Sequence, residues 1–264
     1  MREERVGIIP KIITIGVLLF LMAPLIVIIL ASFSPTVLVV FPPQGFSLEW
    51  YANIFTSSAN FVSGFANSIK IAVIATSIDI LLGVSAALAV TRYNFKGKDS
   101  LVAFFTSPMY VPSIAFSFVI LRITSSQLIL SAFTRILLGH IVIILPYIVR
   151  NTLAVLTGFN WSLEDAAASL GASPRQTFMK VTLPLIKPGV MAGALLSFLY
   201  SFDEAVLGNM LNSPKFITLP VRIMNYMEFS FDPTLAAIST LLIILSLTCI
   251  VAMERFIGLD MFLK

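Results

Sequence analysis

Long apolar runs recur along this chain, and they constrain its fold more than any other feature of the sequence. A membrane-spanning helix needs roughly 20 mostly apolar residues. Segments of that kind are expected over residues 12–32, 68–91, 100–122, 134–156, 187–210 and 234–254. Because backbone groups in lipid must form hydrogen bonds within their own segment, all six segments are predicted to be helices.

The composition indicates the same class of protein. The chain has 264 residues, of which 58% are hydrophobic and 11% are charged, whereas a soluble domain is about 45–50% apolar and about 25% charged. The sequence therefore predicts an all-α integral membrane protein. Basic residues do not gather beside exposed aromatic residues, which argues against nucleic-acid binding. Cys249 is the one cysteine and lies in an apolar run, so neither a disulfide within the chain nor a metal site is expected.

Lysine and arginine fall unevenly on the two sides that six spans would define. The side that holds both chain ends carries Arg2, Arg5, Lys11, Arg92, Lys96, Lys98, Arg150, Arg175, Lys180, Lys187, Arg255 and Lys264. The other side carries Lys70, Arg122, Arg135, Lys215 and Arg222. Since basic residues are enriched in cytoplasmic loops, both termini are predicted to be cytoplasmic. Residues 1–264 are interpreted as a single transmembrane domain.

The longest loop on the predicted cytoplasmic side, at about 157–185, begins with the pattern of a short helix. Ser162 is suited to cap its N-terminus. Glu164 and Asp165 would lie in the first turn, near the positive end of the helix dipole. Three alanines follow, and Gly171 permits the left-handed residue that commonly ends a helix.

A second short helix is predicted directly after this glycine. Ser173-Pro174-Arg175-Gln176 is typical of a capping box with proline at the first helical position. Leu183-Pro184 is expected to end this helix. A simple connector is the alternative, but it would not require two capped helices whose alanine and glycine surface lets another protein approach closely.

The loop resembles the EAA loop of ABC-importer permeases. That pattern is an acidic residue, two alanines, three residues, glycine, nine residues, an aliphatic residue, any residue and Leu-Pro. The matching residues are Asp165, Ala166, Ala167, Gly171, Val181, Leu183 and Pro184, with Asp in place of Glu and Val in place of Ile. Segments 41–51, 92–97, 201–204 and 218–220 resemble the polyamine/opine-type branch. Over nearly its whole length the chain is similar to the second permease subunits of spermidine/putrescine importers.

The resemblance implies a type I (MetI-like) permease fold in the bacterial inner membrane. It also implies a second permease, two cytoplasmic ATPase subunits and an external substrate-binding protein as partners. ATP and Mg²⁺ would be bound by those ATPases, and this chain is expected to bind no cofactor and to catalyse no reaction. Its Gly97-Lys98-Asp99 lacks the upstream glycine and the hydroxyl residue of a phosphate-binding loop. The residues implied to contact the ATPase are Glu164, Asp165, Ala166, Ala167, Gly171, Ala172, Ser173, Pro174, Leu183 and Pro184.

Ionisable residues inside the predicted spans are candidates for the translocation path, because burying a charge in a membrane is costly. Asp203 and Glu204 in the fifth span and Asp79 in the second are the main candidates. A path of negative potential would suit a cationic substrate, and ion pairs between helices are the alternative. For His140 in the fourth span, a hydrogen-bonded packing role is favoured.

The substrate is the least constrained part of the interpretation. A polyamine or an opine-like solute is expected from the resemblance, with a phosphonate or an amino-acid derivative as the alternative. An ion-coupled carrier or a channel would leave the two-helix loop unexplained, and neither paired halves nor a filter-like segment occurs. Pro108, Pro112 and Pro146 lie inside predicted spans, where proline interrupts helical hydrogen bonding and favours kinks.

Overall fold

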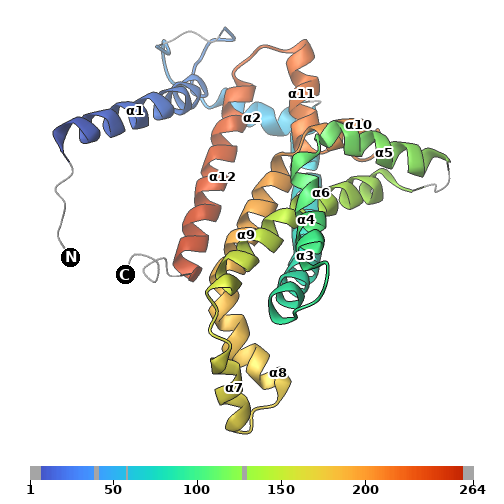
Figure 1. Ribbon diagram of the computed structural model, residues 1–264. Helices are drawn as coiled ribbons and strands as arrows, with labels where there is room; N and C mark the ends of the chain where they lie inside the picture. Colours follow the sequence, from blue (N-terminus) through green and yellow to red (C-terminus); the bar gives the residue numbers. More distant parts are fainter. Residues whose placement is uncertain (1–6, 39–41, 58, 127–129, 258–264) are drawn as a thin grey trace. The chain divides into compact units, whose positions relative to one another are not determined.

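The computed structural model describes residues 7–38, 42–57, 59–126 and 130–257, and its regular structure is helical (Figure 1). The helices are α1 (Ile8–Ala31), α2 (Glu49–Thr56), α3 (Phe61–Arg92), α4 (Lys98–Thr106), α5 (Ser113–Ser126), α6 (Ala132–Thr157), α7 (Ser162–Ser169), α8 (Pro174–Thr177), α9 (Leu183–Asp203), α10 (Val206–Leu211), α11 (Leu219–Phe229) and α12 (Thr234–Ile257). Within these described residues, five helices are long and apolar enough to cross a membrane. A bent pair brings the number to six if it forms one span.

The chain divides into two compact units, and each is described by itself. The first contains the described residues up to Phe61 together with Ile223–Ser246. In this unit the Trp50 indole donates a hydrogen bond to the Ser34 carbonyl at 2.6 Å, and Asn53 donates to the Thr234 hydroxyl at 2.9 Å. The first bond joins α2 to the segment after α1, and the second joins α2 to the beginning of α12. No residue in the most apolar part of α1 is buried within the chain, so its side chains are left for lipid or another subunit to cover.

The second unit, Val62–Arg222 together with the described residues from Leu247 onward, has its core where α3, α6 and α9 pack together. Val84 and Ala87 of α3 contact Ile148 and Leu156 of α6 and Ile186 of α9. A further apolar cluster joins α3 and α6 to α10 through residues that include Ile71, Ile144 and Leu207. These clusters hold three long helices together within one body.

Two glycines let α9 approach α6 closely. A Cβ atom on Gly189 would lie 2.6 Å from the Asn151 carbonyl oxygen. A Cβ atom on Gly193 would lie 3.0 Å from the Ile148 Cα atom. Gly189 and Gly193 form a G-x-x-x-G pair, which is how membrane helices commonly bring their backbones together. This pair was not among the sequence-based predictions, although two glycines four residues apart in an apolar run are the signal for it.

The third predicted span is not a single straight helix. It is divided into α4, a 3₁₀ turn at Ser107–Tyr110 and α5, and its two halves are bent by 99°. Pro108 and Pro112 lack the N–H groups that would continue the helical hydrogen bonds, and Val111, directly before Pro112, is extended. Pro146 behaves differently, because α6 is assigned as one helix through it and covers the predicted fourth span.

The fifth predicted span also differs from the expectation. The predicted helix over 187–210 ends at Asp203, and α10 begins at Val206. Glu204 between them is extended, with φ −68° and ψ 108°. The interpretation of Asp203 and Glu204 as consecutive residues of one continuous helix is therefore wrong.

Candidate functional site

The loop between α6 and α9 forms a hairpin of two short helices, α7 and α8, at one end of the second unit (Figure 1). We call Ser162–Thr177 the coupling hairpin. The prediction that Ser162 caps α7 is wrong, because Ser162 is the first helical residue. The Asn160 side chain lies ahead of it and accepts hydrogen bonds from the Ser162 backbone nitrogen at 3.1 Å and from its hydroxyl at 2.7 Å.

The turn of the hairpin depends on one glycine. Gly171 has φ +84°, in the left-handed region that glycine adopts without steric penalty. Its N–H donates to the Ala168 carbonyl at 2.9 Å, and the Ala172 N–H donates to the Ala167 carbonyl at 3.0 Å. This pair of bonds is a Schellman motif, which confirms the predicted helix end.

The second helix begins as predicted but does not end as predicted. Ser173 and Gln176 form both hydrogen bonds of a capping box, with Pro174 at the first helical position. Leu183-Pro184 does not end this helix, because α8 continues through a π turn at Phe178–Thr182 into α9. A π turn widens the hydrogen-bonding register, which gives the Pro184 ring room where a regular turn would place it against the Lys180 carbonyl. Pro174–Asp203 is consequently one 30-residue helix.

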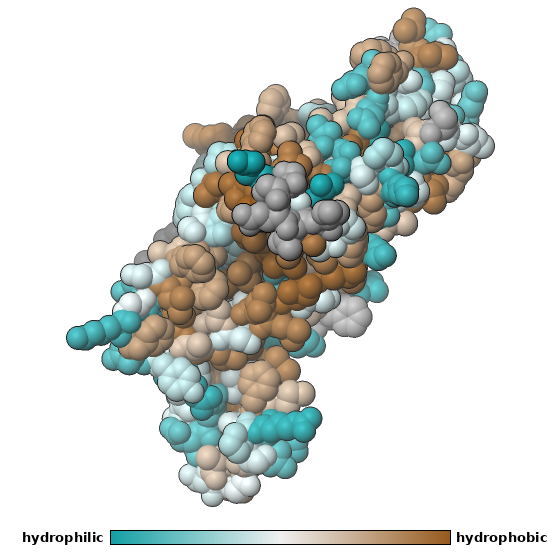
Figure 2. Space-filling view, turned by 90° about the vertical axis from the view of Figure 1, so that its right-hand side faces the viewer, coloured by the Kyte–Doolittle hydropathy of each residue, from teal (hydrophilic) through white to brown (hydrophobic). Residues whose placement is uncertain are grey.

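The predicted contact residues are mostly on the outside of the hairpin, with Ala167, Ala172 and Leu183 partly buried and Glu164 buried. Asp165, Ala166, Gly171, Ser173, Pro174 and Pro184 are exposed. A hollow of about 320 Å³ lies between α7 and α8, lined by residues that include Ala167, Gly171 and Val181. At its edge Leu170 is 89% exposed. In Figure 2 the hairpin at the bottom of the view is mostly hydrophilic or neutral, with a few apolar side chains.

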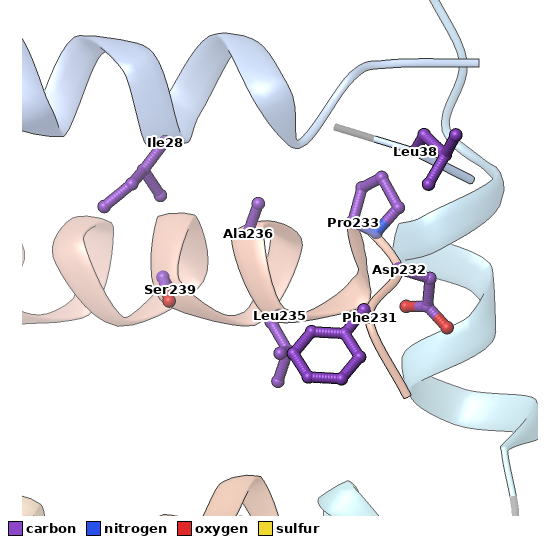
Figure 3. A pocket seen from close by; sticks show the side chains of 8 residues that line it. All are labelled: Ile28, Leu38, Phe231, Asp232, Pro233, Leu235, Ala236 and Ser239. Atoms are coloured by element: carbon purple, nitrogen blue, oxygen red, sulfur yellow. The ribbon is translucent and has the colours of Figure 1, made fainter. Parts of the chain in front are cut away.

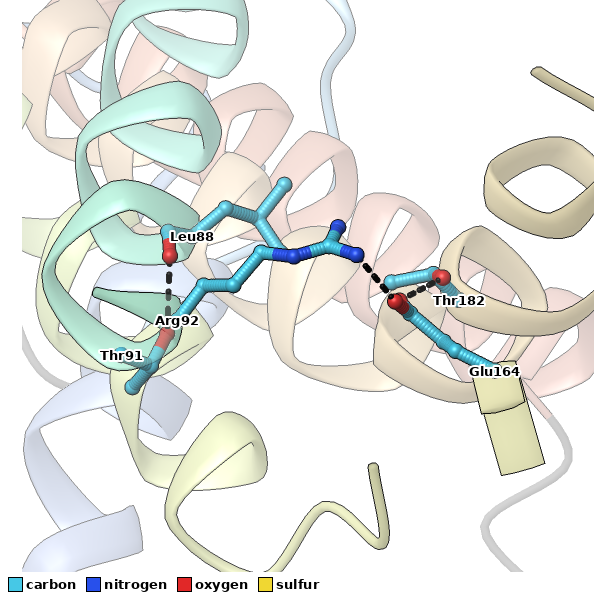
Figure 4. A network of polar contacts seen from close by, with 5 residues as sticks. All are labelled: Leu88, Thr91, Arg92, Glu164 and Thr182. Atoms are coloured by element: carbon cyan, nitrogen blue, oxygen red, sulfur yellow. Dashed lines mark hydrogen bonds and ion pairs between the residues drawn. The ribbon is translucent and has the colours of Figure 1, made fainter. Parts of the chain in front are cut away.

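Glu164 and Asp165 have different surroundings, although the sequence assigned them the same role. Glu164 is 7% exposed, and its Oε2 lies 2.8 Å from Nη2 of Arg92 at the end of α3. The Thr182 hydroxyl donates to Glu164 Oε1 at 2.5 Å (Figure 4). The Arg92 guanidinium also lies over the Trp161 ring, 5.8 Å from its centroid. Sequence reasoning missed this pairing, because nothing in the spacing of residues 92 and 164 indicates contact.

At the other end of α9, Asp203 and Glu204 are also distinct. Asp203 is exposed on the surface of the chain, whereas Glu204 is buried. Glu204 Oε1 accepts hydrogen bonds from the Val206 and Leu207 nitrogens at 3.0 and 3.1 Å, so this carboxylate caps α10. The Ser113 hydroxyl of α5 donates to its Oε2 at 3.4 Å. Of these two neighbouring carboxylates, only that of Asp203 is exposed.

Asp79 and His140 are enclosed in the helical core. The Asp79 side chain is fully buried, and both of its carboxylate oxygens lack a hydrogen-bond partner among the described residues. It therefore does not line an open path in this conformation. His140 Nδ1 lies 2.7 Å from the Ser201 hydroxyl, a hydrogen bond between α6 and α9 that agrees with the packing role favoured for it.

The first unit contains a separate apolar hollow of about 480 Å³ (Figure 3). Ile28 of α1 and Leu235, Ala236 and Ser239 of α12 are among the residues that line it. None of the predicted site residues belongs to it.

The fold agrees with what comparison with known proteins shows. Residues 79–261 match the family described as binding-protein-dependent transport system inner membrane component, and the chain belongs to that family. It is the permease subunit of a MetI-type ABC importer and a multi-pass protein of the bacterial inner membrane, without catalytic activity of its own.

Proteins similar to this chain are named for the transport of different solutes. The chain is 31% identical over 208 residues to the spermidine/putrescine transport system permease protein PotC of Haemophilus influenzae, covering 79% of this chain and 80% of the relative. It is 29% identical over 231 residues to the putrescine transport system permease protein PotI of Escherichia coli, covering 85% and 82%. It is also 32% identical over 211 residues to the trehalose transport system permease protein SugB of Mycobacterium tuberculosis, covering 79% and 77%.

Solved structures share the fold. A bacterial ABC transporter involved in the import of the acidic polysaccharide alginate matches with a TM-score of 0.68 at 18% identity, covering 98% of this chain and 97% of that one. The MetNI methionine transporter in inward-facing conformations matches with a TM-score of 0.63 at 18% identity, covering 75% and 94%. These matches confirm the type I permease fold. Both ends of the chain lie outside the described residues, and the cytoplasmic location of the termini stays a prediction.

Proposed function

We propose that this chain receives the force of ATP hydrolysis through the coupling hairpin and forms a translocation path for a small polyamine with a second permease. One of two ATPase subunits that hold ATP and Mg²⁺ would dock on the hairpin, and an external binding protein would deliver the solute. Docking on the hairpin is supported by one observation above others. Its exposed surface combines a hollow, the adjacent Leu170 side chain and Gly171 in open space. A partner's side chain could occupy the hollow, because no Cβ atom projects from the turn.

The test of docking uses two glycines with the same backbone geometry. Gly171 and Gly97 both have left-handed φ angles, of +84° and +92°, and a Cβ atom at either would meet nothing within 4 Å. Gly171→Asp and Gly97→Asp therefore add the same charge and similar backbone strain in two different loops. We expect the ATPase subunits to co-purify with the Gly97→Asp variant and to be lost from Gly171→Asp. Retention of the ATPase by Gly171→Asp, with normal transport, would show that the hairpin is not the docking surface.

A polyamine is the proposed substrate because relatives named for spermidine and putrescine transport match most of the chain, and because Asp203 presents an exposed carboxylate. In a site of low dielectric constant, a single negative charge lowers the energy of a nearby cation appreciably. The attraction must remain weak enough for release. The match to a trehalose permease at similar identity favours a second candidate, a neutral sugar, for which Asp203 would act through hydrogen bonds.

Uptake measurements separate the two substrates. In proteoliposomes that contain the assembled importer, we expect labelled putrescine or spermidine to be taken up and trehalose not to be. Asp203→Asn should slow polyamine uptake about tenfold, the effect of losing about 1.4 kcal/mol of transition-state stabilisation, while the complex assembles normally. Trehalose uptake without polyamine uptake would replace the proposed substrate and leave the docking proposal standing.

A further inference from the structure

Arg92, Glu164 and Thr182 connect three elements that are far apart in the sequence. Arg92 is at the end of α3, Glu164 is in the first turn of α7, and Thr182 is at the end of the π turn that leads into α9 (Figure 4). Each Glu164 oxygen has its own partner, Arg92 Nη2 at 2.8 Å and the Thr182 hydroxyl at 2.5 Å. We call these three residues the Arg92–Glu164–Thr182 cluster.

The cluster makes Glu164 unsuitable as a contact for another protein. Its side chain is 7% exposed, and both oxygens are already engaged. To reach a docked subunit, the carboxylate would have to give up both partners, and the buried Thr182 hydroxyl would be left without its acceptor, which is costly. Asp165, its neighbour, is exposed and remains available.

The coupling hairpin is continuous with α9 and is joined to α6 through a short segment, but it has no comparable covalent connection to α3. Movement of α3 with the hairpin therefore requires non-covalent contacts. Apolar contacts among Ala87, Leu156, Ile186 and the partly buried Trp161 hold the helices together near the hairpin. Such contacts are non-directional, whereas a charge-assisted hydrogen bond between guanidinium and carboxylate fixes orientation.

We propose that Arg92 and Glu164 are positioning residues that fix the coupling hairpin to α3, so that a force applied to the hairpin moves α3 and α9 together. This inference rests on the proposed function of the hairpin. Without the ion pair, α7 can tilt against α3 while the ATPase stays bound. ATP hydrolysis then continues with less solute carried per cycle.

The experiment measures the ratio of solute uptake to ATP hydrolysis in proteoliposomes that contain the assembled importer. Arg92→Gln and Glu164→Gln remove the ion pair, and Glu164→Gln keeps an oxygen that Thr182 can donate to. We expect both variants to co-purify with normal amounts of ATPase and to lose about fivefold or more of the uptake per ATP, the lower end of typical coupling between sites. Arg92→Lys should keep most of that ratio, and Asp99→Asn supplies the control at an exposed carboxylate in the first turn of α4, outside both the cluster and the residues predicted to contact the ATPase.

Three results would overturn the proposal. One is an unchanged ratio in both glutamine variants. Another is loss of ATPase from Glu164→Gln but not from Arg92→Gln, which would make Glu164 a docking contact. The third comes from the double variant Arg92→Glu, Glu164→Arg, which keeps the ion pair with its two charges exchanged. It is measured if the single variants do not assemble. Assembly with the parental ratio then supports the proposal, and failure to assemble or a reduced ratio contradicts it. Failure of the docking proposal is seen separately, as retention of ATPase by Gly171→Asp.

Discussion

The role of an acidic residue in this chain depends on which groups contact its carboxylate. Glu204 accepts two backbone hydrogen bonds at the beginning of α10, and Glu164 pairs with Arg92 and Thr182. Asp165 and Asp203, each adjacent in the sequence to one of these, are exposed. In α7 and at the C-terminal end of α9, one of two neighbouring acidic residues therefore holds the structure and the other is exposed.

Glu204 gives a prediction about stability. Glu204→Ala removes the acceptor of the Val206 and Leu207 N–H groups, and loss of a helix cap costs about 0.5–2 kcal/mol. Glu204→Gln keeps an oxygen at the same position. We expect the melting temperature of the detergent-purified complex to fall clearly for Glu204→Ala and much less for Glu204→Gln. Equal melting temperatures for the parent and Glu204→Ala would contradict the capping role.

The arrangement of the helices depends on glycines and on local breaks in helical hydrogen bonding, as well as on apolar side chains. The G-x-x-x-G pair of α9 brings it against α6, the bend between α4 and α5 falls at two prolines, and a π turn precedes Pro184. Each of these features sets how one element lies against the next.

The contact between α6 and α9 can be tested with matched glycine substitutions. A Cβ atom at Gly189 would lie 2.6 Å from the Asn151 oxygen, whereas a Cβ atom at Gly16 in α1 would meet nothing within 4 Å. Gly189→Ala should therefore destabilise the protein by about 1–3 kcal/mol, as overpacking commonly does. Gly16→Ala should leave thermal unfolding unchanged or slightly improved. Equal stability of both variants would show that α6 and α9 can separate without cost.

The sequence predicts the elements of this chain better than their ends. Apolar length located the long helices, because lipid requires it, and the spacing of Ala166, Gly171 and Ser173 predicted the hairpin turn. The end at Asp203 was not predicted, because the Glu204 carboxylate that caps α10 lies in an apolar segment without other turn residues. The continuation through Pro184 was missed because proline normally ends a helix unless the preceding turn widens. The partner of Glu164 is 72 positions away in the sequence, and no local pattern indicates such a contact.

At the scale of the whole molecule, the chain presents much apolar surface that it does not cover itself. The most apolar part of α1 has no buried residue, and only 17% of the corresponding part of α12 is buried. Lipid accepts such surfaces without penalty, and so does another membrane subunit. Such surfaces are consistent with a subunit that is completed by its surroundings. The interpretation of residues 1–264 as one domain stays a prediction.

The orientation in the membrane is testable with two reporter fusions. The distribution of basic residues predicts that the coupling hairpin is cytoplasmic and that the segment between α10 and α11 is external. A reporter inserted near Thr177 should therefore be inaccessible to an external label in intact cells, and one near Pro214 should be accessible. The reverse labelling would overturn the orientation and would place the hairpin out of reach of a cytoplasmic ATPase.

The helix Pro174–Asp203, which continues through the π turn, has a mechanical consequence. Its 30 residues correspond to a rod of about 45 Å, at about 1.5 Å per residue. The tight contact with α6 at Gly189 and Gly193 lies about 26 Å from the hairpin end and about 18 Å from Asp203 by the same measure. A rod that turns about this contact is a lever with arms in a ratio of about 3:2. A push of about 3 Å on the hairpin would then swing the Asp203 end by about 2 Å in the opposite direction.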